Sequence, residues 1–106
     1  MQTDLNKLLK EVKELLKDEM TRVAFDTWIK SLEMVGKEGN TYIVGVTSNI
    51  HYDSVKSRYF DLILNTFKYI TNSEDCELEI VVTRKILRNK KSKYTKWLHG
   101  FYFRIF

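Results

Sequence analysis

The chain has 106 residues, a single cysteine and a formal net charge of +4. This length suits one domain with its own hydrophobic core, and one cysteine excludes an intrachain disulfide. The charge is unevenly placed, because residues 84–106 hold eight basic and no acidic residues, whereas residues 1–83 hold ten basic and fourteen acidic ones. The sequence predicts a cytoplasmic protein with an acidic domain over residues 1–83 and a basic aromatic tail over residues 84–106.

Leucine spacing predicts a first helix over residues 4–19, capped by Thr3 or Asp4. The first part of the chain has no continuous apolar run that would serve as a signal peptide or a membrane span. Lysine and glutamate side chains, Lys13 among them, are expected to cover the outer side of this helix. Its apolar stripe is formed by Leu5, Leu8, Leu9, Val12, Leu15 and Leu16.

A second helix is predicted over residues 23–32, with Thr21 placed to cap its first turn. Four apolar residues in this segment are spaced at i, i+3, i+4 and i+7, which places them on one side of an α-helix. Aromatic side chains bury a large apolar area, so we expect this side to form the centre of the core. The four residues are Phe25, Trp28, Ile29 and Leu32.

The pattern after residue 32 predicts two strands, over 33–35 and 41–46, joined by a turn over residues 36–40. The second run is rich in β-branched and aromatic residues, and Gly39 with Asn40 suits a hairpin turn. Residues 36–39 read Gly-Lys-Glu-Gly, the form of the GxxG loop with which KH domains bind single-stranded nucleic acid. Here the segment joins strands rather than helices, and Glu38 would repel phosphate, so a turn is expected.

A third helix is predicted to begin after Ser48 and to end near Ile70, before a polar turn over residues 72–75. Residues 78–83 are mostly apolar and predict a third strand that is central or covered. The order helix-helix-strand-strand-helix-strand predicts a two-layer α+β domain with the helices on one face of a three-stranded sheet. Tyr52, Val55, Tyr59, Leu62, Ile63, Thr66, Phe67 and Ile70 form the inner side of the third helix.

No combination of residues in the chain indicates catalysis, a metal site or a cofactor, so we expect a protein that is not an enzyme. His51, Asp53 and Ser54 are the residue types of a hydrolytic triad, but residues two apart on a helix point away from each other. His51 is instead expected at the surface. Cys76 lies between Asp75 and Glu77, whose charges we expect to raise the pKa of its thiol.

Four motifs along residues 5–83 resemble the N-terminal domain of the bacterial replication initiator DnaA. They are the Phe25-x-x-Trp28-Ile29 helix, the Gly39-Asn40-Thr41 hairpin, the segment Lys56-Ser57-Arg58-Tyr59 and the closing strand Leu78–Val82. The resemblance implies a KH-like fold, which agrees with the element order obtained from the residue pattern. It also implies a protein-interaction domain that self-associates at the origin and docks the replicative helicase or regulatory proteins.

The contact positions of this family fall on Leu9, Ala24, Phe25 and the segment Ser48-Asn49-Ile50. Leu9 stands where the family places a self-association aromatic, and core packing is the alternative role for it. Ala24 precedes the phenylalanine of the second helix. In the segment Thr47–Ile50, threonine, serine and isoleucine replace the proline, asparagine and phenylalanine of the family's Pro-Asn-x-Phe motif, so an aromatic anchor is lost.

The initiators of this family continue into an AAA+ ATPase and a helix-turn-helix domain, whose motifs are absent from this sequence. We therefore expect either a portion of an initiator or a stand-alone homologue that engages initiator partners.

The tail from residue 84 matches no segment of the family known to us. Residues 84–93 read as a basic linker, and residues 94–105 have the spacing of an amphipathic helix. Four roles remain open for the tail: packing on the domain, binding single-stranded nucleic acid, lying on an anionic membrane surface, or self-association. The residues expected to contact nucleic acid are Arg84, Lys85, Arg88, Lys90, Lys91, Lys93, Lys96 and Trp97, and the apolar stripe comprises Tyr94, Trp97, Leu98, Phe101, Tyr102 and Ile105.

Overall fold

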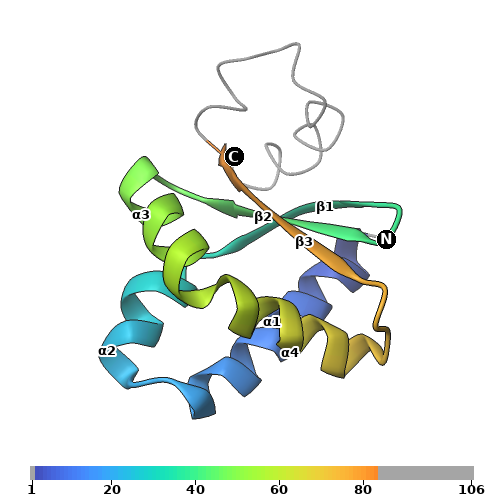
Figure 1. Ribbon diagram of the computed structural model, residues 1–106, viewed down its shortest axis with the longest axis horizontal. Coiled ribbons are helices and arrows are strands. Elements are labelled where there is room, and N and C mark those ends of the chain that lie inside the picture. Colours follow the sequence, from blue (N-terminus) through green and yellow to red (C-terminus); the bar gives the residue numbers. More distant parts are fainter. Residues whose placement is uncertain (1, 84–106) are drawn as a thin grey trace.

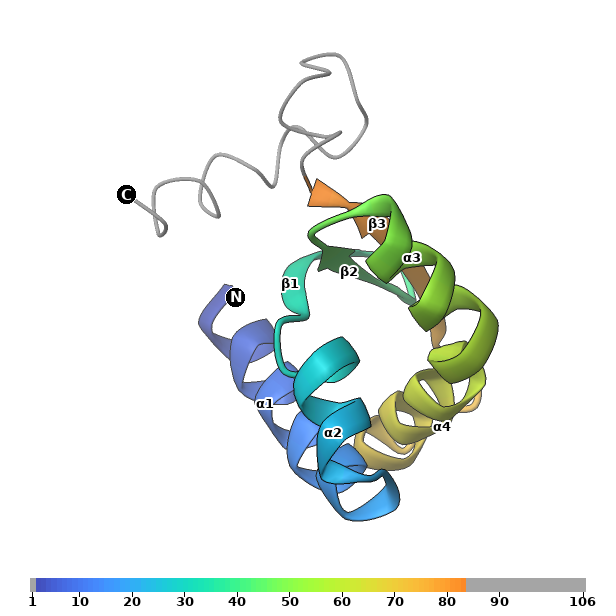
Figure 2. The ribbon, with the colours of Figure 1, turned by 90° about the vertical axis from the view of Figure 1, so that its left-hand side faces the viewer.

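The computed structural model describes residues 2–83, with side chains from residue 4 onward, and has the predicted α+β order. A three-stranded sheet lies over a layer of helices, all on one of its faces (Figures 1 and 2). The elements are α1 (Gln2–Glu19), α2 (Arg22–Ala24) continuing as the π-helical segment η1 (Phe25–Ile29), β1 (Glu33–Glu38), β2 (Thr41–Val46), α3 (Asn49–Ser54) continuing through the π-helical segment η2 (Val55–Tyr59) into α4 (Phe60–Thr71), and β3 (Glu77–Val82).

Helix α1 presents most of its predicted leucine stripe to the core, but Leu15 is 38% exposed, so its assignment to the stripe is wrong. Leu9, Val12 and Leu16 are at most 4% exposed, and the helix packs against α4 and β1. The helix begins at Gln2, so the prediction that Thr3 or Asp4 caps it is wrong. Both residues lie within the first turn, because the helical backbone starts earlier than the leucine spacing indicates.

The second helix departs from the regular α-helix predicted over residues 23–32. Thr21 caps it as expected, since its Oγ1 accepts a hydrogen bond from the N–H of Ala24 at 3.2 Å. From Phe25 the backbone widens into a π-helix, in which the Lys30 N–H donates to the Phe25 carbonyl at 2.9 Å. The helix ends before Leu32, which reaches the core from the connection to β1.

The core positions predicted for this segment are otherwise confirmed. Phe25, Ile29 and Leu32 are buried, at 8%, 0% and 2% exposed. Trp28 is half-buried and packs against the same cluster. A π-turn occurs frequently beside functional sites, and here it brings the backbone of Trp28 next to α3.

The β1–β2 hairpin turns through two residues, Gly39 and Asn40, rather than the five predicted. Gly39 has a φ of +62°, which suits the first position of a type II′ turn. Gly36 belongs to β1, where a bulge lies between Met34 and Gly36. Three residues of the apparent GxxG motif, 36–38, therefore belong to β1, and only Gly39 lies in the turn.

The third helix begins where predicted, with Ser48 Oγ accepting a hydrogen bond from the His51 N–H at 3.1 Å. It continues through η2 to Thr71, and its inner residues Val55, Ile63 and Phe67 are completely buried. Asn72 ends the helix in the left-handed conformation at φ 54° and ψ 40°, as polar turn residues commonly do.

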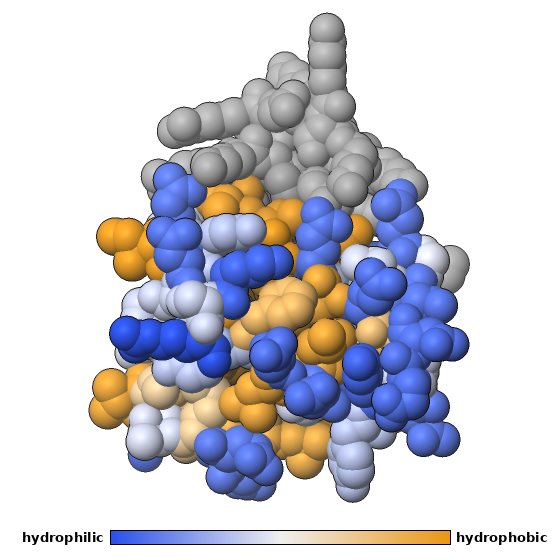
Figure 3. All heavy atoms as spheres, in the orientation of Figure 1, coloured by the Kyte–Doolittle hydropathy of each residue, from blue (hydrophilic) through white to orange (hydrophobic). Residues whose placement is uncertain are grey.

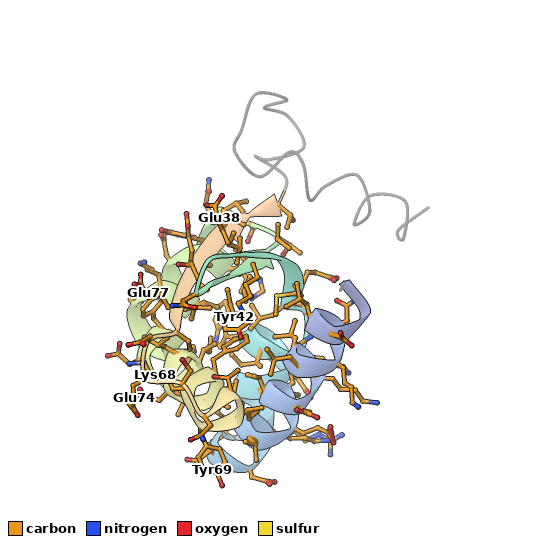
Figure 4. The ribbon with its side chains drawn as sticks, turned by 90° about the vertical axis from the view of Figure 1, so that its right-hand side faces the viewer. Glu38, Tyr42, Lys68, Tyr69, Glu74 and Glu77 are labelled. Atoms are coloured by element: carbon orange, nitrogen blue, oxygen red, sulfur yellow. The ribbon has the colours of Figure 1, made fainter. Side chains whose placement is uncertain are left out.

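The sheet order is β1-β2-β3, with β1 antiparallel and β3 parallel to β2. Strand β2 is therefore central and β3 is an edge strand. Of the two alternatives predicted for β3, central or covered, the central position is wrong. Tyr42 points from β2 into the interior, where its ring stacks on Phe67 at 4.8 Å between centroids (Figure 4). This contact joins the sheet to α4 at the centre of the core.

Candidate interaction surface

Two segments that the family resemblance singles out lie at the same end of the molecule. Figure 2 shows α2 and the beginning of α3 on the face turned toward the viewer. Val23 and Ile50 are the most exposed large aliphatic residues of the described chain, at 76% and 74%. We call this area the α2–α3 surface and define it as Val23, Ala24, Ser48, Asn49 and Ile50.

The apolar part of the α2–α3 surface is visible in the space-filling view. Orange groups interrupt the hydrophilic surface at the left edge, over α2 and over the start of α3 (Figure 3). Ser48 and Asn49 are exposed beside Ile50, while Ala24 is half-buried. In Figure 3 hydrophilic groups lie between the two orange ones, so the surface offers two separate apolar contacts in a polar surround, as the rim of a protein interface does.

A buried histidine connects the two elements of this surface. His51 is 5% exposed, and its Nε2 lies 2.7 Å from the Trp28 carbonyl oxygen at the end of η1. Because a carbonyl only accepts, Nε2 carries the proton, and Nδ1 faces the Thr47 hydroxyl at 3.5 Å. The rings of His51 and Trp28 are 6.0 Å apart and tilted by 47°.

The sequence-based prediction that His51 lies at the surface is therefore wrong. Helix α3 packs its first turn against η1, and the imidazole donates to a carbonyl that the widened helix leaves without an intrahelical donor. Its ring nitrogens face Trp28 and Thr47 rather than Asp53, so the geometry gives no triad. The role of His51 is to hold the two elements together.

Lys13 performs a similar function at the same helix end. Its Nζ donates to the carbonyl oxygens of Lys30 at 2.8 Å and Leu32 at 2.7 Å. Burial lowers the pKa of this ammonium group, and the nearby charge of Glu33 partly opposes that effect. The prediction that Lys13 belongs to the exposed side of the first helix is wrong, since it reaches across to cap free carbonyls.

Two of the predicted contact residues are not part of the exposed surface. Leu9 is 4% exposed and Phe25 is 8% exposed, and both belong to the core cluster. For Leu9, the structure favours core packing, which was the alternative role. For Phe25, the burial agrees with its other predicted role, in the core. Neither side chain is available for a partner without rearrangement of the domain.

Val23 was not among the predicted contact residues, although a signal for it exists. It precedes Phe25 by two positions, and residues two apart on a helix point away from each other. The buried Phe25 therefore directs Val23 toward solvent. Arg22 and Asp26 on the same exposed side form an ion pair at 3.7 Å.

Other parts of the described chain offer little chemistry. A groove of about 420 Å³ lies between α1 and α4, lined by Leu15, Asp18, Glu19, Leu62, Asn65, Thr66 and Tyr69. Tyr69, at its rim, is 78% exposed and points away from the domain in Figure 4. Within residues 2–83, no group of three acidic, histidine or cysteine side chains is arranged to hold a metal ion. The same residues contain no helix long and apolar enough to cross a membrane.

Cys76 is buried in the turn before β3, at 4% exposed. Burial is the main reason why the pKa of its thiol is raised, and the nearby positive charges of Lys68 and Lys37 oppose this. The predicted direction is confirmed, but Asp75 and Glu77 are not the cause.

The predicted nucleic-acid contacts in the tail lie outside the described residues. These are Arg84, Lys85, Arg88, Lys90, Lys91, Lys93, Lys96 and Trp97. The expected amphipathic helix over residues 94–105 lies outside them as well.

Comparison with protein families agrees with this fold. Residues 6–69, which include most of α1, the π-helical segment η1, the hairpin and most of the third helix, match the DnaA N-terminal domain. The match spans more than half of the chain and contains the whole α2–α3 surface. The chain belongs to the family of DnaA N-terminal domains, which act in the initiation of DNA replication.

Proposed function

We propose that this domain is a non-catalytic protein-interaction module that acts in the cytoplasm, and that its α2–α3 surface contacts another protein of replication initiation. The partner is the initiator, a second copy of this chain, the replicative helicase or a regulatory protein. The main supporting observation is the exposure of Val23 and Ile50 on two elements that His51 holds together.

The chemistry of the surface suits a protein partner of moderate affinity. Two exposed aliphatic side chains bury apolar area on contact, and the hydroxyl and amide of Ser48 and Asn49 supply hydrogen bonds at the rim. The buried link between Trp28 and His51 fixes the relative position of the two halves, which limits the ordering that binding requires.

Ala24 and Ile50 provide smaller contacts than aromatic side chains in the same places. Two small aliphatic contacts favour a reversible complex over a permanent one. We therefore expect dissociation constants in the micromolar range, about 1–100 μM, for the cognate partner.

Pull-down and light-scattering experiments with the full chain test the proposal against the cognate initiator, the replicative helicase and the chain itself. Replacing Ile50 or Val23 by glutamate places a charge in the contact without disturbing the core. Each change is expected to weaken binding by about tenfold or more.

Tyr69→Glu is the matched control, because Tyr69 is equally exposed but lies on α4, away from the α2–α3 surface. It should leave binding unchanged. Equal weakening by Tyr69→Glu would move the contact elsewhere. If none of these partners binds at concentrations up to about 300 μM, the proposal is wrong, because such concentrations exceed the weakest expected dissociation constant.

The alternative function, binding of single-stranded nucleic acid, depends on tail residues outside the described part. The domain itself does not favour it, because residues 1–83 carry more acidic than basic side chains. A nucleic-acid binder would lose affinity steeply with added salt. Fluorescence anisotropy of a labelled thymidine oligonucleotide at two salt concentrations distinguishes the alternatives.

A further inference from the structure

The sheet has a second face, turned away from the helices, which we call the outer face. Side chains alternate along a strand, and Tyr42 and Val44 point toward the helices. Ile43 and Gly45 therefore point the other way, and the strand register places Val81 of β3 beside Gly45. Val35 lies at the β1 bulge, close to Gly45 on the same side.

The centre of the outer face is apolar. Val35, Ile43 and Val81 lie there, and none of them belongs to the core cluster that the helices form with the sheet. The described helices all lie on the opposite face (Figures 1 and 2). No described helix therefore covers these three side chains.

Acidic residues border this apolar centre. Glu38 of β1 and Glu77 of β3 both pair with Thr41, which places them in one row across the sheet. Glu79 pairs with Ile43 in the next row. Figure 4 shows Glu38 on the side of the sheet opposite the inward-pointing Tyr42. Each of these three glutamates carries a negative charge onto the outer face.

Residues 84–106 have the composition that complements this face. They contain eight basic and no acidic residues, and their apolar residues have the spacing of one helical stripe. They continue directly from β3, an edge of the same sheet. Ten residues, 84–93, can span about 33 Å, whereas three strands extend over only about 10 Å.

We propose that residues 84–106 fold back over the outer face of their own chain, with the aromatic stripe on Val35, Ile43 and Val81 and the basic side chains toward the glutamate border. The helices, the sheet and the tail then form three layers, whereas the helices and the sheet alone form two. This arrangement leaves the α2–α3 surface accessible, because that surface lies among the helices rather than on the outer face.

Methyl NMR on the full chain tests the proposal. The variant Trp97→Ser/Phe101→Ser removes two rings of the stripe, and Lys96→Ser/His99→Ser is the matched control on the other side of the predicted helix. The aromatic variant is expected to shift the methyl signals of Val35, Ile43 and Val81, because nearby rings dominate such shifts. The control should shift them much less.

Methyl groups on the helix side of the sheet report whether the aromatic variant still folds. The signals of Val12, Val55 and Ile63 should stay in place, since these residues pack under the sheet. Unchanged signals of Val35, Ile43 and Val81 in the aromatic variant would overturn the proposal. If that variant also lost binding to a thymidine oligonucleotide, the tail would instead be a nucleic-acid contact.

A spin label identifies whether the cover comes from the same chain. A nitroxide on Lys96→Cys, in a Cys76→Ser chain, should broaden the Ile43 and Val81 methyl signals of the chain that carries it. In a mixed sample, one set of chains carries the nitroxide but no isotope, and the other set carries the isotope but no nitroxide. The methyl signals of the isotope-labelled chains should then show no broadening. Broadening only in the mixture would show that a second copy covers the face and would overturn the proposal.

Discussion

Replacing His51 by alanine removes the link between η1 and α3 and tests its role directly. The Trp28 carbonyl would lose its donor in a buried position, which costs about 1–3 kcal/mol. Loss of the ring contact with Trp28 adds about 0.5–1.5 kcal/mol. The expected decrease in the free energy of unfolding is therefore about 1.5–4.5 kcal/mol.

Urea unfolding followed by circular dichroism measures this decrease. With an m-value of about 1.5 kcal/mol/M, the midpoint should fall by about 1–3 M at unchanged m. His51→Gln retains an N–H donor that can reach the carbonyl, so it should recover part of the loss. Asn49→Ala, an exposed change in the same helical turn, should alter stability by less than about 0.5 kcal/mol.

If His51→Ala is no more destabilising than Asn49→Ala, the Trp28 carbonyl finds water or another donor at no cost, and His51 does not stabilise the link between η1 and α3. If His51→Ala destabilised the domain but His51→Gln recovered nothing, ring packing rather than the hydrogen bond would be the main contribution of His51.

Three further changes test other packed groups. Lys13→Met should lower stability at pH 7 by about 1–3 kcal/mol, because the carbonyls of Lys30 and Leu32 lose their donor. Burial lowers the folded-state pKa of Lys13 below its ordinary value of 10.5. Its titration therefore contributes stability that is fully present above pH 10.5 and is lost as the pH falls through the folded-state pKa. The difference in unfolding free energy between Lys13→Met and the natural chain should change over this pH range. Cys76 should react with a thiol reagent at least about tenfold more slowly in the folded than in the urea-unfolded chain. The raised pKa of the Cys76 thiol stabilises the folded state fully below pH 9.0. This contribution should decrease as the pH rises from 9.0 toward the folded-state pKa of the thiol. The decrease should be absent in Cys76→Ala. Gly45→Ala should cost about 1–3 kcal/mol in thermal unfolding, because the added Cβ would overlap the Cγ2 atoms of Thr83 and Val35; unchanged stability would mean that these side chains move aside freely.

The local pattern of the sequence was sufficient to predict the element order. Leucine spacing in α1, β-branched residues in β2 and the cap at Ser48 each act within a few residues, so they can be read without knowledge of the fold. The burial of Phe25 and Ile29 followed from their helical spacing. These features also carried the family resemblance, because its motifs are short and local.

The candidate surface was only partly predictable. Asn49 and Ile50 were identified by resemblance and are exposed, but Leu9 was assigned to contact as well as to packing and proved to be buried. A stripe position on an amphipathic helix faces either a partner or the core, and sequence spacing alone does not distinguish the two. Which neighbours a helix meets is a property of the whole fold.

The sequence by itself determined which segments are helical, which are extended and which sides are apolar, because those preferences act between residues close in the chain. Only the tertiary structure decided the surroundings of His51 and Lys13, whose hydrogen bonds reach residues 23, 17 and 19 positions away. Both side chains bind carbonyls at or just after the end of a π-helical turn that spacing alone did not predict. The burial of a polar side chain depends on the acceptors that distant segments bring to it, and no local pattern contains that information.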